Sequence, residues 1–204
     1  MCRDPALTSR GYRRLRLGGA FRFKCIRCDY CCGTGPNIAI TVYDVIRMSR
    51  RLGMYWKGFL ETFTNVIIAD MLPFISLKGN DRGECLFMER GEENATSCRI
   101  YDARPMKCRF YPLHVASPSA NYVYLDTKCP GVDRGVKGRV PRRLYDQYVW
   151  ELRGHYSALY RLVFEEGYEP LDALYRLLDD KWAEAWREKP AWSNLKHIED
   201  LGST

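Results

Sequence analysis

The sequence has no long hydrophobic run. Its most apolar stretch, VIIADMLPFI at residues 66 to 75, is short and contains Asp70 and Pro73, which excludes a membrane-spanning helix. The first 19 residues carry charges without the apolar run of a secretory signal peptide, so Cys2 lacks the context of a lipoprotein cysteine. We expect a cytoplasmic protein without a membrane partner.

Histidine and glutamine are also scarce. The 3 His residues, His114, His155 and His197, are scattered, and we expect structural or surface roles for them rather than metal ligation. The single Gln and the excess of Arg over Lys, 23 to 9, are compositional signs of a thermophilic source.

Motifs of two enzyme classes are missing. No GxGxxG loop follows an expected strand, and the GTG at residues 33 to 35 lies in a cysteine-rich loop, where its glycines suit a turn. The cysteine spacing contains no CxxxCxxC triplet, which radical chemistry would require. The sequence therefore gives no motif-based prediction of a nucleotide-binding or radical catalytic site.

The composition is that of an ordered globular protein. Apolar residues make up 46%, charged residues 28% and aromatic residues 13% of a 204-residue chain, enough for one domain with a hydrophobic core. The net charge of +7 is uneven, because residues 1 to 51 hold eleven Lys and Arg against three acids, and residues 128 to 143 hold six against one. The basic segments interleave with Tyr and Phe, which is typical of nucleic-acid contact but also of a solvated basic tail.

Hydrophobic periodicity predicts helices on both sides of a strand-rich middle. Residues 41 to 53 read as a helix with Thr41 as N-cap, Asp44 in a capping box and Gly53 as the stop. Residues 55 to 71 read as a second, less regular helix. Short strands are expected within residues 74 to 79, 84 to 88, 98 to 101 and 121 to 127.

Two further helical stripes in the C-terminal third predict a helical hairpin. Their apolar residues recur at three and four residue steps, and we expect them to be core. They are Tyr145, Tyr148, Leu152, Tyr156, Leu159 and Val163, then Leu171, Leu174, Tyr175, Leu178, Trp182 and Trp186.

These elements predict an α+β fold, a small cysteine-rich domain of short strands and helices stabilised by metal. We expect a basic N-terminal arm at residues 1 to 20, the cysteine-cluster domain at residues 21 to 135, and a C-terminal helical extension packed on it at residues 136 to 204. The glycine-rich residues 130 to 140 mark the boundary.

Eight cysteines lie between positions 25 and 129, and four of them fall within eight residues. They are Cys25, Cys28, Cys31, Cys32, Cys85, Cys98, Cys108 and Cys129. Thiolates two residues apart on a turn close on one metal ion with little loss of loop entropy, and eight thiolates supply two four-thiolate sites. Disulfides would explain an even number of cysteines but not this crowding.

The adjacent Cys31 and Cys32 constrain how the ligands are shared. Neighbouring side chains diverge in extended backbone, so we expect the two to face different centres or different atoms of a multinuclear cluster. One would join Cys25 and Cys28, and the other would join the distant cysteines. Both zinc and an iron–sulfur cluster suit the set. Cys25, Cys28 and Cys31 with the remote Cys129 before a proline would fit a [4Fe–4S] cluster.

Several basic residues lie close to the cysteines in the sequence, namely Arg27, Arg99, Arg104, Lys107 and Arg109. Buried thiolates need cations or N–H donors nearby, although some of these side chains will be ordinary surface charges. In CRIYDARPMKC, Pro105 keeps Arg104 extended and starts a short helix with Cys108, which Pro112 ends. We expect Tyr101, Asp102 and Arg104 to support the metal ligands rather than to catalyse.

The chain resembles the CxxCxxCC family of zinc- or iron-chelating proteins, the YkgJ-like cysteine-cluster proteins. The likeness rests on FKCIRCDYCCGTGPNIAITVYDVIRMSRRLGM, GECLFM, CRIYDARPMKCRFYP and CPG, covering roughly residues 21 to 135. The resemblance implies that the eight cysteines bind metal or an iron–sulfur cluster.

Three functions remain open. The first is a metal or cluster protein with a structural or redox centre. The second is an S-adenosylmethionine-dependent protein methylase, because flagellin lysine-N-methylases contain a similar cysteine-cluster region. The third is an RNA- or ribosome-associated metal protein, or one with a protein partner, that uses the basic N-terminal region RGYRRLRLGGAFRFK and the loop RGVKGRVPRR.

Overall fold

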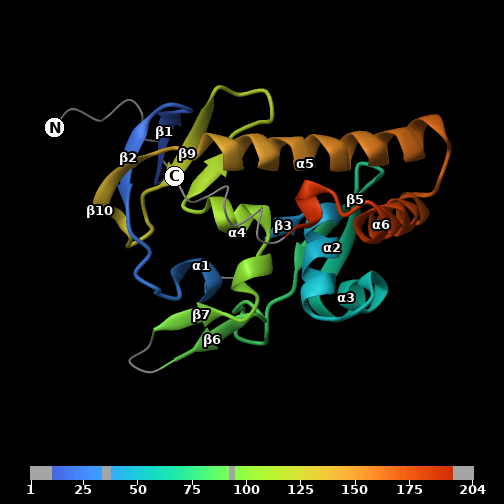
Figure 1. Ribbon diagram of the computed structural model, residues 1–204, viewed down its shortest axis with the longest axis horizontal. Helices are drawn as coiled ribbons and strands as arrows, with labels where there is room; N and C mark the ends of the chain where they lie inside the picture. The colour runs from blue at the N-terminus through green and yellow to red at the C-terminus, as the bar shows by residue number, and fades with distance from the viewer. Residues whose placement is uncertain (1–10, 34–37, 92–94, 195–204) are drawn as a thin grey trace.

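The computed structural model describes residues 11–33, 38–91 and 95–194. Cys2, His197, Thr34 and Gly35, with the first ten residues of the predicted arm and the last ten of the C-terminal extension, lie outside the described residues. The fold is α+β, as predicted, with helices and short antiparallel strands (Figure 1).

The described strands form four antiparallel sheets. The first sheet has the order β1 (Tyr12–Arg16), β9 (Tyr122–Asp126), β8 (Leu113–Val115), and the second pairs β2 (Ala20–Phe23) with β10 (Val132–Arg139). The third has the order β3 (Ala39–Ile40), β5 (Leu72–Leu77), β4 (Thr64–Ala69), and the fourth pairs β6 (Met88–Arg90) with β7 (Thr96–Cys98).

The helices are interspersed with these strands along the described chain. They are α1 (Tyr30–Gly33), α2 (Val42–Arg51), α3 (Trp56–Phe63), α4 (Met106–Phe110), α5 (Arg142–Tyr160) and α6 (Pro170–Arg187). Short turns of other helix types are η2 (Tyr101–Ala103), η3 (Arg161–Glu165) and η4 (Ala191–Ser193). None of the helices within the described ranges is long and apolar enough to cross a membrane.

The predicted first helix is confirmed as α2. Its capping box is complete, because the Thr41 hydroxyl oxygen accepts from the Asp44 N–H and the Asp44 carboxylate accepts from the Thr41 N–H at 3.0 Å. Gly53 follows the helix with a φ of 66°, the left-handed conformation that glycine adopts without strain.

The predicted second helix is wrong in its second half. Helix α3 ends at Phe63, and Thr64–Ala69 forms strand β4, paired with β5. This segment contains the β-branched residues Thr64, Val66, Ile67 and Ile68, which are stiff in helices and pack well on a pleated sheet. The strand expected at residues 84 to 88 is confirmed only at its end, where β6 begins at Met88.

The predicted helical hairpin is confirmed by α5 and α6. Most of its apolar stripe is core, but Tyr156, Leu171, Tyr175 and Trp186 are exposed. The larger hydrophobic cluster joins α2, α3, β5 and α6, and the smaller one joins β8, β9, α4 and the start of α5. Residues of the hairpin belong to both clusters, so the hairpin shares its core with the rest of the fold. The division into an N-terminal arm, a cysteine-cluster domain and a C-terminal extension stays a prediction.

Candidate metal centre

Five of the eight cysteines come from four separate segments that lie near one another. Helix α1 carries Cys31 and Cys32, Cys85 precedes β6, Cys98 ends β7, and Cys108 lies in α4. Figure 1 shows α1 between α4 and the β6–β7 hairpin. All eight cysteines from Cys25 to Cys129 are free thiols, with no disulfide among them.

The expectation that Cys31 and Cys32 diverge is wrong. It assumed extended backbone, whereas these residues lie in the helical turn α1, and their Sγ atoms are 3.7 Å apart. A tetrahedral zinc ion with Zn–S bonds of about 2.3 Å separates its sulfur ligands by about 3.8 Å. The two thiols can therefore serve one ion or two ions that lie side by side.

Backbone hydrogen bonds attach the next cysteines to this pair. The Cys85 N–H donates to the Cys32 carbonyl at 2.7 Å, and the Met88 N–H donates to the Cys85 carbonyl at 3.0 Å. Met88 is in turn the register partner of Cys98 across the β6–β7 hairpin. The positions of Cys32, Cys85 and Cys98 are thus coupled through the main chain.

Cys28 and Cys129 are held by other contacts, which the sequence did not reveal. The Thr96 hydroxyl donates to the Cys28 carbonyl at 2.8 Å and ties it to β7. Cys129 is buried, and its side chain forms a hydrogen bond with the hydroxyl of Tyr111, which also contacts Asp126 at 3.2 Å. Cys25 is exposed.

The electrostatics show which thiols influence each other. Burial raises the pKa of Cys85, Cys98 and Cys108, and negative charge on Cys31 raises all three further. Burial also raises the pKa of Cys129, to which charge on Cys28 and Cys31 contributes. Negative charge on Cys31 therefore acts on the pKa of Cys85, Cys98 and Cys108 and also on that of Cys129.

The vicinal thiols polarise one another. A hydrogen bond from Cys32 lowers the pKa of Cys31 to about 7, with a smaller contribution from the Arg104 charge, and the same hydrogen bond raises the pKa of Cys32. A bound metal ion replaces such thiol protons, because the thiolate is the ligand form.

In the part of the chain that the structure describes, no three His, Cys, Asp or Glu side chains already form a group that could hold a metal ion. The gathered cysteines are a donor set rather than a finished coordination sphere. The chemistry of this set, soft sulfur donors from several segments, fits zinc and iron–sulfur clusters and does not fit hard cations such as Mg²⁺ or Ca²⁺.

Arg104 is a cation whose charge acts on the thiols. Its guanidinium lies 3.7 Å from the ring centroid of Tyr101, and its charge lowers the pKa of Cys31 and Cys98. Arg109 donates from Nε to the Arg104 carbonyl at 3.0 Å, and Asp102 forms an ion pair with Arg51 of α2 at 2.8 Å. These contacts fix the segment before Cys108.

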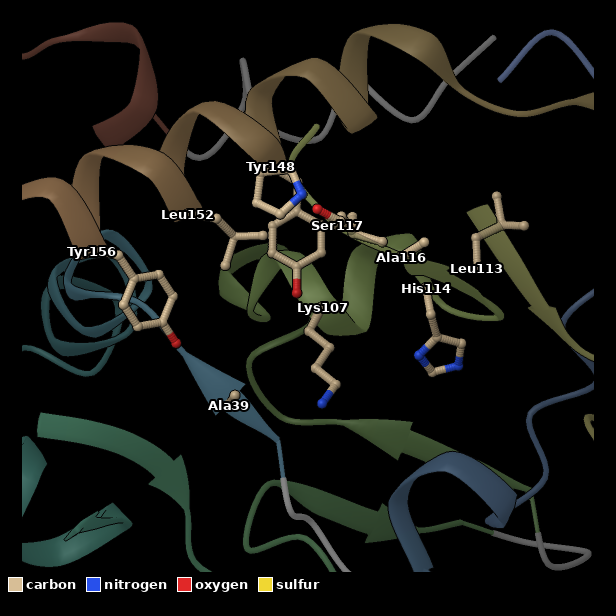
Figure 2. Close-up of a pocket in the computed structure, with 11 residues that line it drawn as sticks. Ala39, Lys107, Leu113, His114, Ala116, Ser117, Tyr148, Leu152 and Tyr156 are labelled. Atoms are coloured by element: carbon tan, nitrogen blue, oxygen red, sulfur yellow. The ribbon is translucent and has the colours of Figure 1, made fainter. Parts of the chain in front are cut away.

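A pocket of about 280 Å³ is lined by residues of α4, β8 and α5 (Figure 2). Lys107 reaches it from α4, Tyr148 and Tyr156 reach it from α5, and His114 reaches it from β8. Burial lowers the pKa of both Lys107 and His114. Since Lys107 precedes Cys108, helix α4 joins the pocket to the cysteine group.

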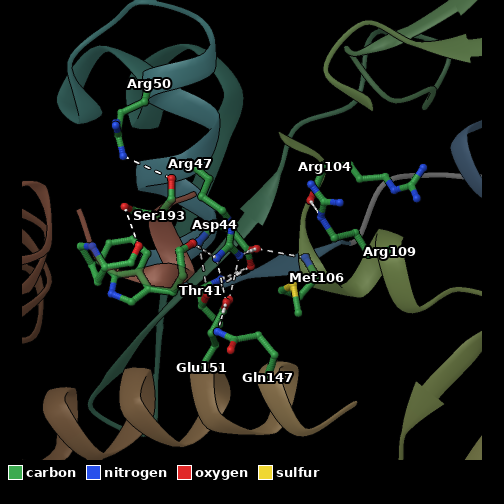
Figure 3. Close-up of polar contacts among 12 residues, drawn as sticks. Thr41, Asp44, Arg47, Arg50, Arg104, Met106, Arg109, Gln147, Glu151 and Ser193 are labelled. Carbon is green, nitrogen blue, oxygen red and sulfur yellow. Dashed lines mark hydrogen bonds and ion pairs between the residues drawn. The ribbon is translucent and has the colours of Figure 1, made fainter. Parts of the chain in front are cut away.

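A buried polar network holds the N-terminal end of α4 (Figure 3). One oxygen of Asp44 accepts from the Met106 N–H at 3.0 Å, and Asp44 and Glu151 both accept from Arg47, at 2.5 and 2.7 Å. The side chains of Asp44, Arg47 and Glu151 are at most 1% exposed. The start of the helix that carries Cys108 is therefore fixed to α2, and through Arg47 to α5.

Gly131 completes the CPG motif for a steric reason. A Cβ atom at this position would collide with the carbonyl oxygen of Lys24, next to Cys25, and the Lys24 N–H donates to the Gly131 carbonyl at 3.0 Å. The motif thus lets the chain after Cys129 approach the chain before Cys25, which brings the two ends of the cysteine region together.

Comparison with known proteins identifies one family. A family model described as "CxxCxxCC: Putative zinc- or iron-chelating domain" matches residues 24–130, which is just over half of the chain and contains all eight cysteines from Cys25 to Cys129. A search of curated proteins found no match, and a search of solved structures found none either.

Proposed function

The chain belongs to the CxxCxxCC family of zinc- or iron-chelating domains, and from this premise we propose that its eight cysteines hold two adjacent metal centres with a structural role. One centre uses Cys32, Cys85, Cys98 and Cys108. The other uses Cys25, Cys28, Cys31 and Cys129. Metal binding is the property of the family; the division of the ligands and the role of the metal are our proposal.

The observation that carries this proposal is the gathering of cysteines from four segments around α1. Cys32 lies next to Cys85 through a 2.7 Å backbone hydrogen bond, while Cys129 shares its electrostatic environment with Cys28 and Cys31. The 3.7 Å between the Cys31 and Cys32 sulfurs brings the two ligand groups into contact. Adjacent centres follow from that contact.

Side-chain burial is small within α1, β6 and β7 themselves, where only the neighbouring residues Phe87 and Ile100 belong to the core, and this supports a structural role. Helix α1 has no buried residue, and Thr96 is the one buried residue of the β6 and β7 strands. Segments with so little hydrophobic burial need another source of stability, and structural metal sites supply folding free energy directly. The metal would tie α1 and the β6–β7 hairpin to α4.

Zinc is the simplest content for the proposed division of the cysteines. Each group supplies four thiolates, which saturate one zinc ion and leave no open coordination position. Cys129 is followed by Pro130, a pattern also seen at cluster ligands, so the second centre is where an iron–sulfur cluster would be expected if one is present.

The test is metal and acid-labile sulfide analysis, with a visible spectrum, on protein purified without oxygen. We expect about two zinc ions per chain, because four thiolates saturate one ion. Cys108→Ser and Cys129→Ser should each lose about one equivalent, and Cys2→Ser, which lies outside the ligand set, should lose none. Iron with sulfide would reject zinc but keep the ligand set. A protein that retains no metal would reject the proposal.

The methylase alternative stays a prediction. All the strand pairs of the described residues are antiparallel, so they form no doubly wound parallel sheet of the nucleotide-binding kind. Equilibrium binding of S-adenosylmethionine to the metal-loaded protein would revive this alternative, and its absence would end it.

A further inference from the structure

One face of the β1–β9–β8 sheet is apolar and the other is aromatic and basic. Successive residues of a strand point to opposite faces, and register partners share a face. Leu15, Val123, Leu125 and Leu113 face the smaller hydrophobic cluster. The opposite face carries Tyr12, Arg14 and Arg16 of β1, Tyr122, Tyr124 and the buried Asp126 of β9, and His114 of β8.

The aromatic rings of this outward face form a connected set. Tyr122 and Tyr124 lie 5.5 Å apart, Tyr12 and Tyr124 lie 6.4 Å apart, and Tyr12 and His114 lie 5.4 Å apart, measured between ring centroids. Tyr122 and Tyr124 are only half-buried, so ring surface remains accessible to a ligand. The Arg14 guanidinium stacks 3.8 Å above the Tyr122 centroid.

Positive charge surrounds these rings. Arg14 and Arg16 are exposed, and at the positions of β1, β9 and β8 the only carboxylate, Asp126, is buried. The β2–β10 sheet follows directly after β1, and its pairing of Lys137 with Arg22 joins the two basic segments that are far apart in the sequence. An ion pair of 3.1 Å between Arg13 and Asp133 holds β10 to β1.

We propose that the outward face of the β1–β9–β8 sheet binds single-stranded RNA. Unpaired bases stack on exposed aromatic rings of a sheet, and Arg side chains beside the rings contact phosphates or stack on bases. The bases of a duplex are paired and stacked inside it, so they could not stack on the rings. An acidic protein partner would account for the basic residues of this face but not for its exposed aromatic rings. This binding is independent of which metal the cysteines hold.

The experiment measures fluorescence anisotropy of a labelled oligouridylate with the full-length, metal-loaded protein at low salt. We expect Tyr124→Ser to weaken binding about tenfold, the usual cost of losing one stacked base. Arg14→Gln should weaken binding several-fold and reduce the slope of log affinity against log salt by about one.

Arg176→Gln is the matched control, because Arg176 is an exposed Arg on α6 whose guanidinium also lies over a tyrosine, 5.3 Å from the Tyr168 centroid. It should bind like wild type. Metal content and circular dichroism of every variant should match wild type, which separates loss of the surface from loss of the fold. The proposal is overturned if wild type does not bind RNA, if Tyr124→Ser binds as tightly as wild type, or if duplex RNA, oligothymidylate, heparin or polyglutamate binds equally well.

Discussion

Replacing Arg47 by Met should cost the protein about 4 kcal/mol of unfolding free energy. Arg47 donates to both oxygens of Glu151 at 2.7 Å, to Asp44, and to the Trp192 carbonyl at 3.0 Å, in a region with at most 1% side-chain exposure. Methionine fills a similar volume but leaves two carboxylates buried without a cation. Breaking a buried ion pair in this way costs about 3–5 kcal/mol.

The loss should become smaller as the pH falls. Burial already raises the pKa of Glu151 while Arg47 opposes that shift. Without Arg47, the folded-state pKa of the carboxylate rises further above its unfolded value, so the folded state binds the proton more tightly and gains stability on acidification. The pH dependence therefore separates an unpaired charge from a simple packing defect.

The assay is urea denaturation of the metal-loaded protein at neutral pH and at mildly acidic pH. Arg50→Met is the matched control on the same helix, since Arg50 is part-buried and donates to the Ser193 carbonyl at 3.3 Å and lies over the Trp186 ring, without an ion pair to a carboxylate of the described residues. It should cost less than about 1 kcal/mol. The double variant Arg47→Met/Glu151→Leu should recover part of the loss. A loss under about 1 kcal/mol for Arg47→Met, or one that grows on acidification, would refute the reasoning.

Three further predictions use other parts of the fold. Gly131→Ala should destabilise the protein by about 1–3 kcal/mol, because the added Cβ would collide with the Lys24 carbonyl oxygen. Gly138→Ala is the control, since Gly138 has open space around it and the substitution should cause no such loss. The midpoints of urea denaturation compare the two variants. Burial lowers the pKa of His155 to about 4, so below about pH 6.5 the unfolded chain binds a proton at this residue and the folded chain does not. The free energy of unfolding should therefore fall by up to about 3 kcal/mol as the pH is lowered from about 6.5 to about 4. Thermal melts across this range measure the fall, and His155→Gln should make stability less dependent on pH. Chelation of the metal under reducing conditions should raise hydrogen exchange in α1 and in β6–β7 while α5 and α6 remain protected, and uniform loss of protection would contradict a local structural role.

Local sequence signals predicted the elements whose determinants are close together in the chain. The capping box of Thr41 and Asp44 with the stop at Gly53 was enough to place α2. The extended conformation of Arg104, with ψ of 147°, and the short helix α4 after it follow from Pro105. The resemblance carried by the cysteine spacing likewise led to the family that the comparison identifies.

Tertiary pairing decided the elements that the sequence mispredicted. Residues 64 to 69 have apolar side chains compatible with a helix, but their register with β5, for example Val66 opposite Ile75, selects a strand. The sequence predicted Asp44 only as a capping residue. Its carboxylate also accepts a hydrogen bond from the N–H of Met106, which is 62 positions away, and no local sequence pattern connects the two residues.

The adjacent cysteines show how local backbone changes the geometry of a candidate site. Extended backbone at Cys31 and Cys32 would make their side chains diverge, whereas the helical turn that they adopt places their sulfurs 3.7 Å apart. In our proposal the same eight ligands form neighbouring centres, and negative charge on Cys31 raises the pKa of Cys129 as well as that of Cys85, Cys98 and Cys108. If the centres are neighbours, loss of Cys31 should disturb the metal at both, while loss of Cys25, which takes no part in the 3.7 Å contact between Cys31 and Cys32, should affect one. Metal analysis of Cys31→Ser beside Cys25→Ser decides between neighbouring and separate centres, since separate centres predict the same loss from both variants.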